Sequence, residues 1–415
     1  MKVLLSAYAC EPNKGSEPGV GWQWALEVAR LGHDVWVLTR TNNRANIESE
    51  LAKLPPITNL NFLYYDLPPW ILARWWKREE RGIHLYYFLW QWGAYLLAKR
   101  VHEVERFDRV HHVTFVTIRI PSFMGNLGIP FVFGPVSGGE RAPWRLRKGY
   151  SLRNLIWEGV KDLSALLIKV DPLMRRTFKQ AERLYVTSEQ SLSLIPRKYR
   201  KKASVQLAIG FNPSELPNLP EQRASDPITN GCFRVLFVGN LLYLKGMHLG
   251  IPAFARLLKE RPDAKLTIVG KGPDERQWRT IADKLGVGDR IDWIPWQDRQ
   301  VLPALYAAHD VFLYPALHDS GGIVVLEALA HGLPVVCLDL FGGGKMVDET
   351  CGLKVDTDGL DEKQAIRALA DRLVQLAQNP ERLRRLSEGT AHRVEEFRWS
   401  AVVKQIYLDL NETEK

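Results

Sequence analysis

Cysteine is scarce in this sequence, and the few cysteines present lie far apart. Four occur in 415 residues: Cys10, Cys232, Cys337 and Cys351. No two of them have CxxC spacing, so the pattern indicates neither a zinc site nor a disulfide framework. No cluster of metal ligands stands out, and no metal is expected. A reducing cytoplasm is the compartment that this cysteine usage favours.

Long apolar runs are also missing. The N-terminal segment MKVLLSAYACEP has too short an apolar core for a signal peptide and is more typical of a first strand. The longest run without charge, residues 120–139, contains three prolines and five glycines. Because a membrane-spanning helix needs about 20 mostly apolar residues without such breaks, no span is predicted.

The loop after the first predicted strand lacks a dinucleotide-binding fingerprint. Lys2–Ala9 predicts a strand, and a glycine-containing loop follows, then a helix from about Trp22 and a second strand over Asp34–Thr39. The loop glycines do not have G-x-G-x-x-G spacing, and Arg40 rather than an acid follows the second strand. This disfavours NAD and leaves NADP a distant alternative. A tight turn explains the glycines equally well.

The chain length favours two domains of roughly 200 residues each. The formal charge of +9 is unevenly spread. Residues 1–220 hold 31 Lys and Arg against 19 Asp and Glu, whereas the remainder holds 25 against 28. The first half is therefore expected to meet something anionic. No recognition motif accompanies its basic runs, so nucleic acid is not the expected partner.

The most informative stretch is DVFLYPALHDSGGIVVLEALAHGLPVVCLDLFGGG, residues 310–344. A buried strand is predicted over Val311–Tyr314, and Gly321-Gly322 begin a helix that runs to about His331. A second buried strand follows over Leu333–Leu338. The connecting loop therefore lies at the carboxyl end of a strand, where open α/β sheets bind ligands.

Two carboxylates frame that helix start: Asp319 in the loop and Glu327 two turns into the helix. The amides of Gly322, Ile323 and Val324 lie between them, at a helix N-terminus suited to an anion. An anion site between two acids that can bind hydroxyls matches a sugar nucleotide. The alternative is an acid that stabilises the helix start and a solvated Glu327.

This stretch resembles the acid-x7-acid signature of the retaining glycosyltransferases of family 4 (glycosyl transferases group 1), including the EALAHGLPVV continuation. The resemblance implies that Asp319 contacts the donor sugar, that Glu327 binds the ribose, and that the amides of 322–324 hold the distal phosphate. The sequence departs from the family in having Asp rather than Glu at 319, and Gly321 where an aromatic residue is usual.

The same resemblance implies roles elsewhere. Lys245 matches a lysine that binds the donor diphosphate, whereas Asn240 replaces an arginine. An active-site histidine is expected at His112 or His111, of which His112 is nearer the end of its strand; satisfied structural histidines are the alternative. The remaining candidates are glycines near the donor and residues near the base, where ordinary packing is equally expected: Gly19, Gly21, Gly343, Gly344, Ile294 and Trp296.

Tryptophan and basic residues are interleaved over residues 67–100. This composition suits the headgroup zone of an anionic membrane, and such contact is considered for Pro69–Arg81. A core-facing helix is the preferred interpretation of Leu85–Ala98. The Pro-, Asn- and Ser-rich segment Phe211–Asp226 is the best candidate for a linker.

The resemblance predicts an α/β fold of the GT-B type, with two doubly wound Rossmann-like domains that face each other across a cleft. Residues 1–210 would bind the acceptor, with a helix over 396–411 crossing back, and residues 211–395 would bind the nucleotide sugar. The expected activity is retaining transfer of a sugar to a sugar or lipid-linked acceptor in surface polysaccharide or glycolipid synthesis, at the inner face of the membrane. Its rivals are a catalytically weakened carbohydrate- or lipid-binding protein and a sugar-nucleotide epimerase.

Overall fold

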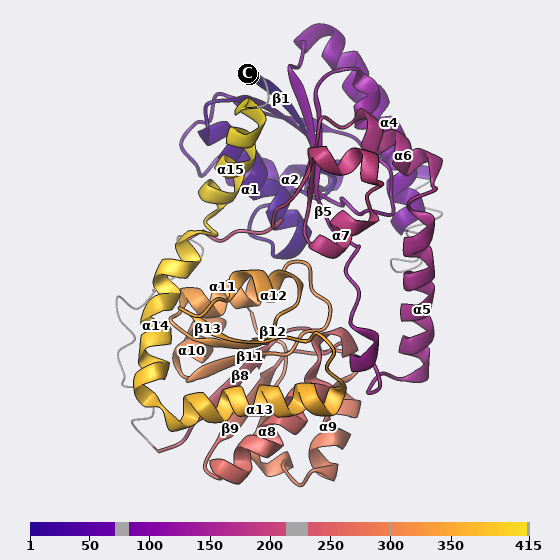
Figure 1. The fold of residues 1–415 in the computed structure, drawn as a ribbon. Helices are drawn as coiled ribbons and strands as arrows, with labels where there is room; N and C mark the ends of the chain where they lie inside the picture. Colours follow the sequence, from indigo (N-terminus) through magenta and orange to yellow (C-terminus); the bar gives the residue numbers. More distant parts are fainter. Residues whose placement is uncertain (71–82, 213–230, 299, 413–415) are drawn as a thin grey trace. The chain divides into compact units, whose positions relative to one another are not determined.

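The computed structural model describes residues 1–70, 83–212, 231–298 and 300–412 (Figure 1). The chain divides into two compact units. The first comprises Met1–Gly139, Leu163–Ile209 and Trp399–Lys415, and the second comprises Glu140–Asp162 and Gly210–Arg398. Among the described helices, none is long and apolar enough to cross a membrane.

The first unit is built on a seven-stranded parallel sheet in the order β3-β2-β1-β4-β5-β6-β7. Its strands are β1 (Lys2–Ser6), β2 (Asp34–Thr39), β3 (Leu60–Tyr64), β4 (Arg109–His112), β5 (Phe131–Val136), β6 (Arg183–Val186) and β7 (Ala203–Val205). Its helices are α1 (Ser16–Arg30), α2 (Arg44–Leu51), α4 (Ile83–Glu105), the end of α5 (Leu152–Leu167), α6 (Pro172–Gln180), α7 (Glu189–Leu194) and α15 (Trp399–Glu412).

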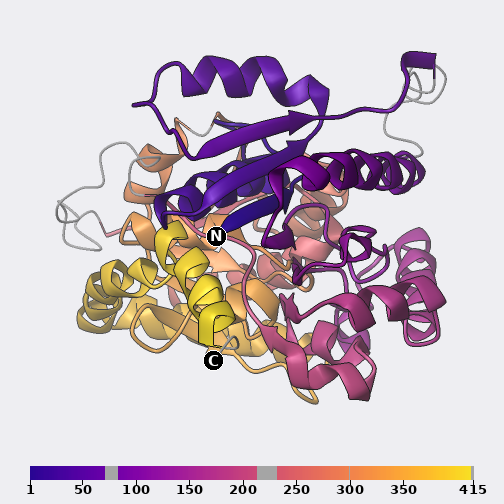
Figure 2. The same ribbon diagram turned by 90° about the horizontal axis from the view of Figure 1, so that it is seen from above.

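Helices cover both faces of this sheet (Figure 2). Neighbouring residues of β4 show this directly, because successive side chains of a strand point to opposite faces. The ring of His111 contacts Trp24 of α1 and Tyr407 of α15, whereas the ring of His112 contacts Tyr87 of α4. The central strands are therefore buried on both faces, which their nearly continuous apolar sequences predict.

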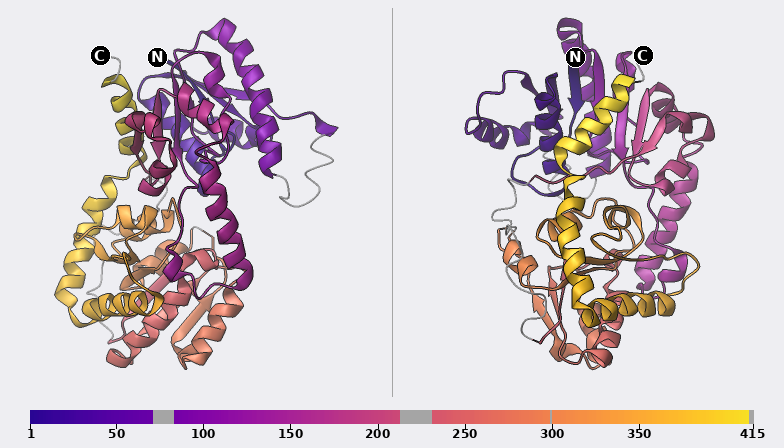
Figure 3. Two further views of the ribbon diagram at one scale, coloured as in Figure 1. Left: turned by 45° about the vertical axis from the view of Figure 1, so that its right-hand side comes forward. Right: turned by 60° about the vertical axis from the view of Figure 1, so that its left-hand side comes forward.

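The second unit repeats the arrangement with six parallel strands in the order β10-β9-β8-β11-β12-β13. Its strands are β8 (Arg234–Val238), β9 (Lys265–Val269), β10 (Ile291–Ile294), β11 (Val311–Tyr314), β12 (Val335–Leu338) and β13 (Gly352–Val355). Its helices are α8 (Met247–Glu260), α9 (Glu275–Lys284), α10 (Leu302–Ala307), α11 (Ile323–Ala330), α12 (Phe341–Met346), α13 (Glu362–Gln378) and α14 (Pro380–Glu395) (Figure 3). In both units the strand order reverses between the first and fourth strands, which is the doubly wound topology that the sequence predicted.

The segment 140–162 belongs to the second unit, although it precedes two strands of the first. Leu146 and Tyr150 are part of the apolar core around Met247 and Leu249. The backbone of Gly149 is also held, because its amide donates to Glu362 and its carbonyl accepts from Gln277 Nε2 at 2.9 Å. The predicted boundary at residue 210 therefore differs from the structure over this segment. Most of the predicted linker, and of the segment Pro69–Arg81, lies outside the described residues.

Helix α1 begins at Ser16 rather than near Trp22, so Gly19 and Gly21 lie inside a helix and not in a loop. The helix packs closely on the turn that follows β1. A Cβ atom at Gly21 would overlap the carbonyl oxygen of Ala9 and press on the Thr114 methyl group. At this position only a residue without a side chain allows the close packing of α1 on the turn.

This packing predicts that Gly21→Ala destabilises the protein by about 1–3 kcal/mol, the usual cost of overpacking. Thermal unfolding followed by circular dichroism would measure the change. Gly15→Ala is the matched control, because a Cβ at Gly15 meets no atom within 4 Å. Equal melting temperatures for the two variants would contradict the packing explanation.

Candidate functional site

The candidate site of the second unit lies where the strand order reverses. Strands β8 and β11 are neighbours, with Val235 paired to Val311. The loops that follow these two strands leave the sheet at the same edge. The loop after β8 carries Lys245, and the loop after β11 carries Asp319. Open α/β sheets bind ligands at this reversal point.

Asp319 is the centre of the hydrogen-bond network at this edge. Its Oδ2 accepts from the Lys245 ammonium and from the Tyr314 hydroxyl at the end of β11. Its Oδ1 accepts from the amides of Gly321 and Gly322 at 3.2 and 3.1 Å. One carboxylate therefore joins the two loops and also binds the two amides that immediately precede α11.

These partners decide the charge of Asp319, whose side chain is 19% exposed. Burial alone would raise the pKa of this carboxyl, but the ammonium of Lys245, the hydroxyl of Tyr314 and the Gly321 amide together lower it below its usual value. Asp319 is thus ionised at neutral pH. Burial and the adjacent carboxylate raise the pKa of Tyr314 well above its usual value, so this hydroxyl stays protonated and donates.

Only two of the three amides expected to be open at the start of α11 have no acceptor among the described residues. The sequence predicted three open amides at Gly322, Ile323 and Val324, but Gly322 donates to Asp319. Within the described part of the chain, no acceptor binds the amides of Ile323 and Val324, which lie in the first turn and have no helical partner. Gly322 has φ +74°, a left-handed conformation that favours glycine. Two amides remain available to an anion.

Glu327 lies on α11 and is 6% exposed, so the interpretation of it as a solvated helix residue was wrong. Its Oε2 accepts from the hydroxyl of Tyr306 on α10 at 3.1 Å. Tyr306 in turn stacks on His331, with ring centroids 5.2 Å apart. Neighbouring aromatic rings therefore fix the position of this buried carboxylate.

Lys245 ends a short 3₁₀ turn, Tyr243–Lys245, before α8. Gly246 follows with φ +74°, and a Cβ there would overlap the carbonyl oxygen of Pro315. The loops after β8 and β11 can approach this closely only because residue 246 has no side chain. Asn240 is exposed, and within the described chain its side chain has no hydrogen-bond partner.

A second group of polar residues supports this loop, and the sequence did not predict it. Buried Glu158 on α5 accepts from the hydroxyl of Tyr243 at 2.9 Å and from Lys161 Nζ at 2.8 Å. Nδ1 of His318 is buried and has no hydrogen-bond partner among the described residues. Burial lowers the pKa of His318, although Glu140 and Glu158 oppose this. Only the folding of residues 140–162 onto this unit brings these side chains together.

The other candidates of the second unit lie near its sheet edge. Ile294 is half-buried at the end of β10, and Trp296 is exposed beneath the ammonium of Lys271. Gly343 and Gly344 belong to α12. A Cβ at Gly343 would come within 2.9 Å of the Tyr314 ring, so packing against β11 accounts for this glycine.

The two candidate histidines of the first unit are fully buried. His111 Nε2 is 2.8 Å from the carbonyl oxygen of Gly134. His112 has its Nε2 2.9 Å from the Tyr87 hydroxyl and its Nδ1 2.8 Å from Ser122 Oγ. Burial lowers the pKa of each ring to about 3, so both are neutral at physiological pH. This geometry matches that of satisfied structural histidines. Within the described residues, no group of three or more His, Cys, Asp or Glu side chains could hold a metal ion.

The fold and this site define the class of the protein as a two-domain α/β protein of the GT-B type. Residues 219–393 match the family described as glycosyl transferases group 1. The matched residues lie in the second unit.

Curated relatives agree with this family. D-inositol 3-phosphate glycosyltransferase of Segniliparus rotundus is 27% identical over 265 residues, which cover 60% of this chain and 53% of the relative. The chain thus spans about half the length of this relative. N-acetyl-alpha-D-glucosaminyl L-malate synthase of Bacillus anthracis is 23% identical over 100% of this chain and 99% of its own. The solved structure of Anabaena HepE in complex with UDP shares the fold, with a TM-score of 0.59 at 15% identity over 99% of this chain and all of its own.

The network around Asp319 predicts a pH-dependent contribution to stability. Because the pKa of Asp319 is lower in the folded than in the unfolded chain, its contribution is present above about pH 4 and is lost as the pH falls through the folded-state pKa. We expect Asp319→Asn to lower the free energy of unfolding by about 1–3 kcal/mol at pH 7, since Lys245 loses a charged partner. Below the folded-state pKa the two proteins should converge. Denaturant unfolding at several pH values measures this, and an unchanged difference at low pH would contradict it.

Proposed function

We propose that this protein transfers a sugar from a nucleotide diphosphate sugar to an acceptor hydroxyl, with retention of the anomeric configuration. The observation that carries the proposal is the arrangement at the β8–β11 edge. A lysine ammonium, two open amides at a helix start and a buried carboxylate on the same helix are the groups that a sugar nucleotide needs. The match to the glycosyl transferases group 1 family supports the reaction class, and the UDP bound to the similar fold of HepE supports a nucleotide as ligand.

In this proposal Lys245 and the amides of Ile323 and Val324 stabilise the departing diphosphate, which is an electrostatic task. Lys245 is paired with Asp319. A diphosphate would supply a stronger anionic partner for the ammonium and so release one oxygen of Asp319 to a sugar hydroxyl. Glu327, held by Tyr306, is assigned to the ribose, and Ile294 is assigned to the base. Asn240 can bind a phosphate oxygen but supplies no charge.

Retention without a covalent intermediate follows from the state of Asp319. When Lys245 binds the diphosphate, this carboxylate still accepts hydrogen bonds from Tyr314, Gly321 and Gly322, which lowers its nucleophilicity. Attack of the acceptor hydroxyl on the face from which the diphosphate leaves is therefore the proposed route, and the leaving phosphate takes the proton. The role that the family resemblance gives to His112 or His111 stays a prediction, since both rings have protein partners in this state.

The proposed acceptor is a sugar or a lipid-linked sugar in surface polysaccharide or glycolipid synthesis, reached from the inner face of the membrane. The charge excess of residues 1–220 supports an anionic surface as a further partner.

A thermal-shift panel of UDP, GDP, ADP and their sugar conjugates tests the donor site. A ligand at about 100 times its dissociation constant should stabilise the protein by roughly 2.7 kcal/mol. We expect stabilisation by one nucleotide family, lost in Glu327→Gln and kept in the matched control Glu349→Gln, which changes an exposed glutamate of the same unit.

Product analysis then separates the enzyme classes. Incubation with the stabilising nucleotide sugar should release free nucleoside diphosphate, and Asp319→Asn should abolish the release. An epimerised sugar nucleotide would instead identify an epimerase, and binding without turnover a binding protein. No stabilisation by any of the nucleotides would refute the assignment of Asp319 and Glu327.

A further inference from the structure

Helix α4 of the first unit is apolar on two opposite faces. One face is buried in the core of this unit and includes Tyr86, Tyr87 and Trp90. The prediction that the helix over Leu85–Ala98 faces the core is confirmed for this face. The opposite face carries four large apolar residues at helical spacing, each 42–47% exposed: Leu85, Leu89, Trp92 and Leu96. A helix that is apolar all round is normally enclosed by protein or lipid.

The exposed charges near this stripe are mostly positive, with Glu103, two turns beyond Leu96 on the same helix, as an exception. Residues 85–100 contain no Asp or Glu, and residues 163–180 contain only Asp171, whose side chain accepts from the amides at the start of α6. Six exposed bases lie in these two segments: Lys99, Arg100, Lys169, Arg175, Arg176 and Lys179. In the part of the chain that the structure describes, none of the six has an ion-pair partner.

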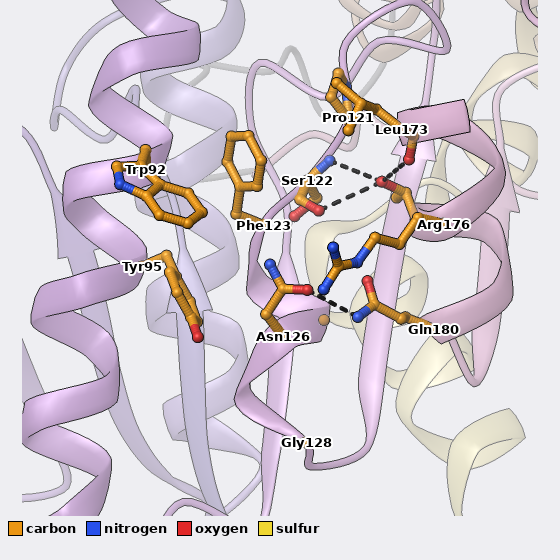
Figure 4. A pocket seen from close by; sticks show the side chains of 12 residues that line it. Trp92, Tyr95, Pro121, Ser122, Phe123, Asn126, Gly128, Leu173, Arg176 and Gln180 are labelled. Atoms are coloured by element: carbon orange, nitrogen blue, oxygen red, sulfur yellow. Dashed lines mark hydrogen bonds between the residues drawn. The ribbon is translucent and has the colours of Figure 1, made fainter. Parts of the chain in front are cut away.

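A cavity of about 360 Å³ joins α4 to α6 on this surface (Figure 4). Trp92 and Tyr95 of α4 and Phe123 form an aromatic wall, and Arg176 and Gln180 of α6 lie across from it. Gln180 Nε2 donates to Asn126 Oδ1 at 2.8 Å, and this hydrogen bond holds the two polar side chains that line the cavity in place. The guanidinium of Arg176 has no hydrogen-bond or ion-pair partner among the described residues. A phosphate-sized anion can therefore meet a free guanidinium beside an aromatic surface.

The apolar surface continues from the cavity rim toward the end of α5. Leu173 lines the cavity and is 41% exposed, and the preceding Leu167 and Val170 are more exposed still. Exposed apolar area thus extends from α4 across the cavity to the turn before α6, where the carboxylate of Asp171 is bound to the α6 amides. We call this surface, with its six bases, the α4–α6 face.

We infer that the α4–α6 face docks on an anionic lipid bilayer. Its leucines and Trp92 would enter the boundary between headgroups and acyl chains, and Arg176 with the other bases would bind lipid phosphates. A second copy of this chain is a poorer occupant, because two identical faces whose exposed charges are mainly positive repel each other. This surface is separate from the site of the second unit, so the inference holds whether or not the proposed transferase reaction is correct.

Vesicle flotation with the purified protein tests the inference. We expect the protein to float with phosphatidylglycerol–phosphatidylcholine vesicles and to remain behind with phosphatidylcholine alone, and added salt should weaken binding. Arg176→Glu should lower the partition coefficient roughly tenfold, since each base near an anionic surface contributes several-fold. Leu89→Glu should lower it at least as much.

Matched controls lie on the second unit. Lys284→Glu and Leu285→Glu change an exposed base and an exposed leucine and should leave binding unchanged. Circular dichroism and the melting temperature check that Leu89→Glu folds. Absence of flotation with anionic vesicles, or equal losses in the control variants, would overturn the inference. A concentration-dependent dimer that Leu89→Glu abolishes, without vesicle binding, would assign the face to a second copy instead.

Discussion

The ion pair between Lys245 and Asp319 is the interaction on which the second unit's functional edge depends. Each residue stands on a loop that leaves one of two neighbouring strands, and the pair closes these loops on each other. The surrounding sequence is consistent with this constraint. Gly246 permits the backbone approach to Pro315, Tyr314 donates from the strand end, and the amides of Gly321 and Gly322 satisfy the second carboxylate oxygen.

The same pair explains how stability and ligand binding can be linked at this edge. A mostly buried ammonium and carboxylate satisfy each other in the absence of ligand, and neither bears the cost of an uncompensated charge. A bound diphosphate would replace Asp319 as the partner of Lys245 without leaving that charge exposed to apolar surroundings. The amides of Ile323 and Val324, which have no acceptor in the described part of the chain, would then complete the anion site.

The fold was predictable from the sequence because its strands are short, apolar and buried on both faces, and because helices alternate with them. The loop between β11 and α11 was predictable for the same reason, with Asp319, Glu327 and the α11 amides in one place. The partners of these residues were not. Tyr314, Tyr306 and Tyr243 have no local signal that separates them from core tyrosines, and Glu158 reaches the site only because residues 140–162 fold onto the second unit. Glycine was the residue type that least reliably indicated a ligand site, since Gly21 and Gly343 are explained by close packing inside the protein.

Calorimetric titration of the stabilising nucleoside diphosphate into the wild-type protein and into Lys245→Met tests the central claim most directly. If Lys245 is the cation of a diphosphate site, the variant should bind at least about tenfold more weakly, a difference of roughly 1.4 kcal/mol. The nucleoside without phosphates should bind both proteins equally. Equal affinity of the diphosphate for the two proteins would contradict the assignment of this edge as the donor site.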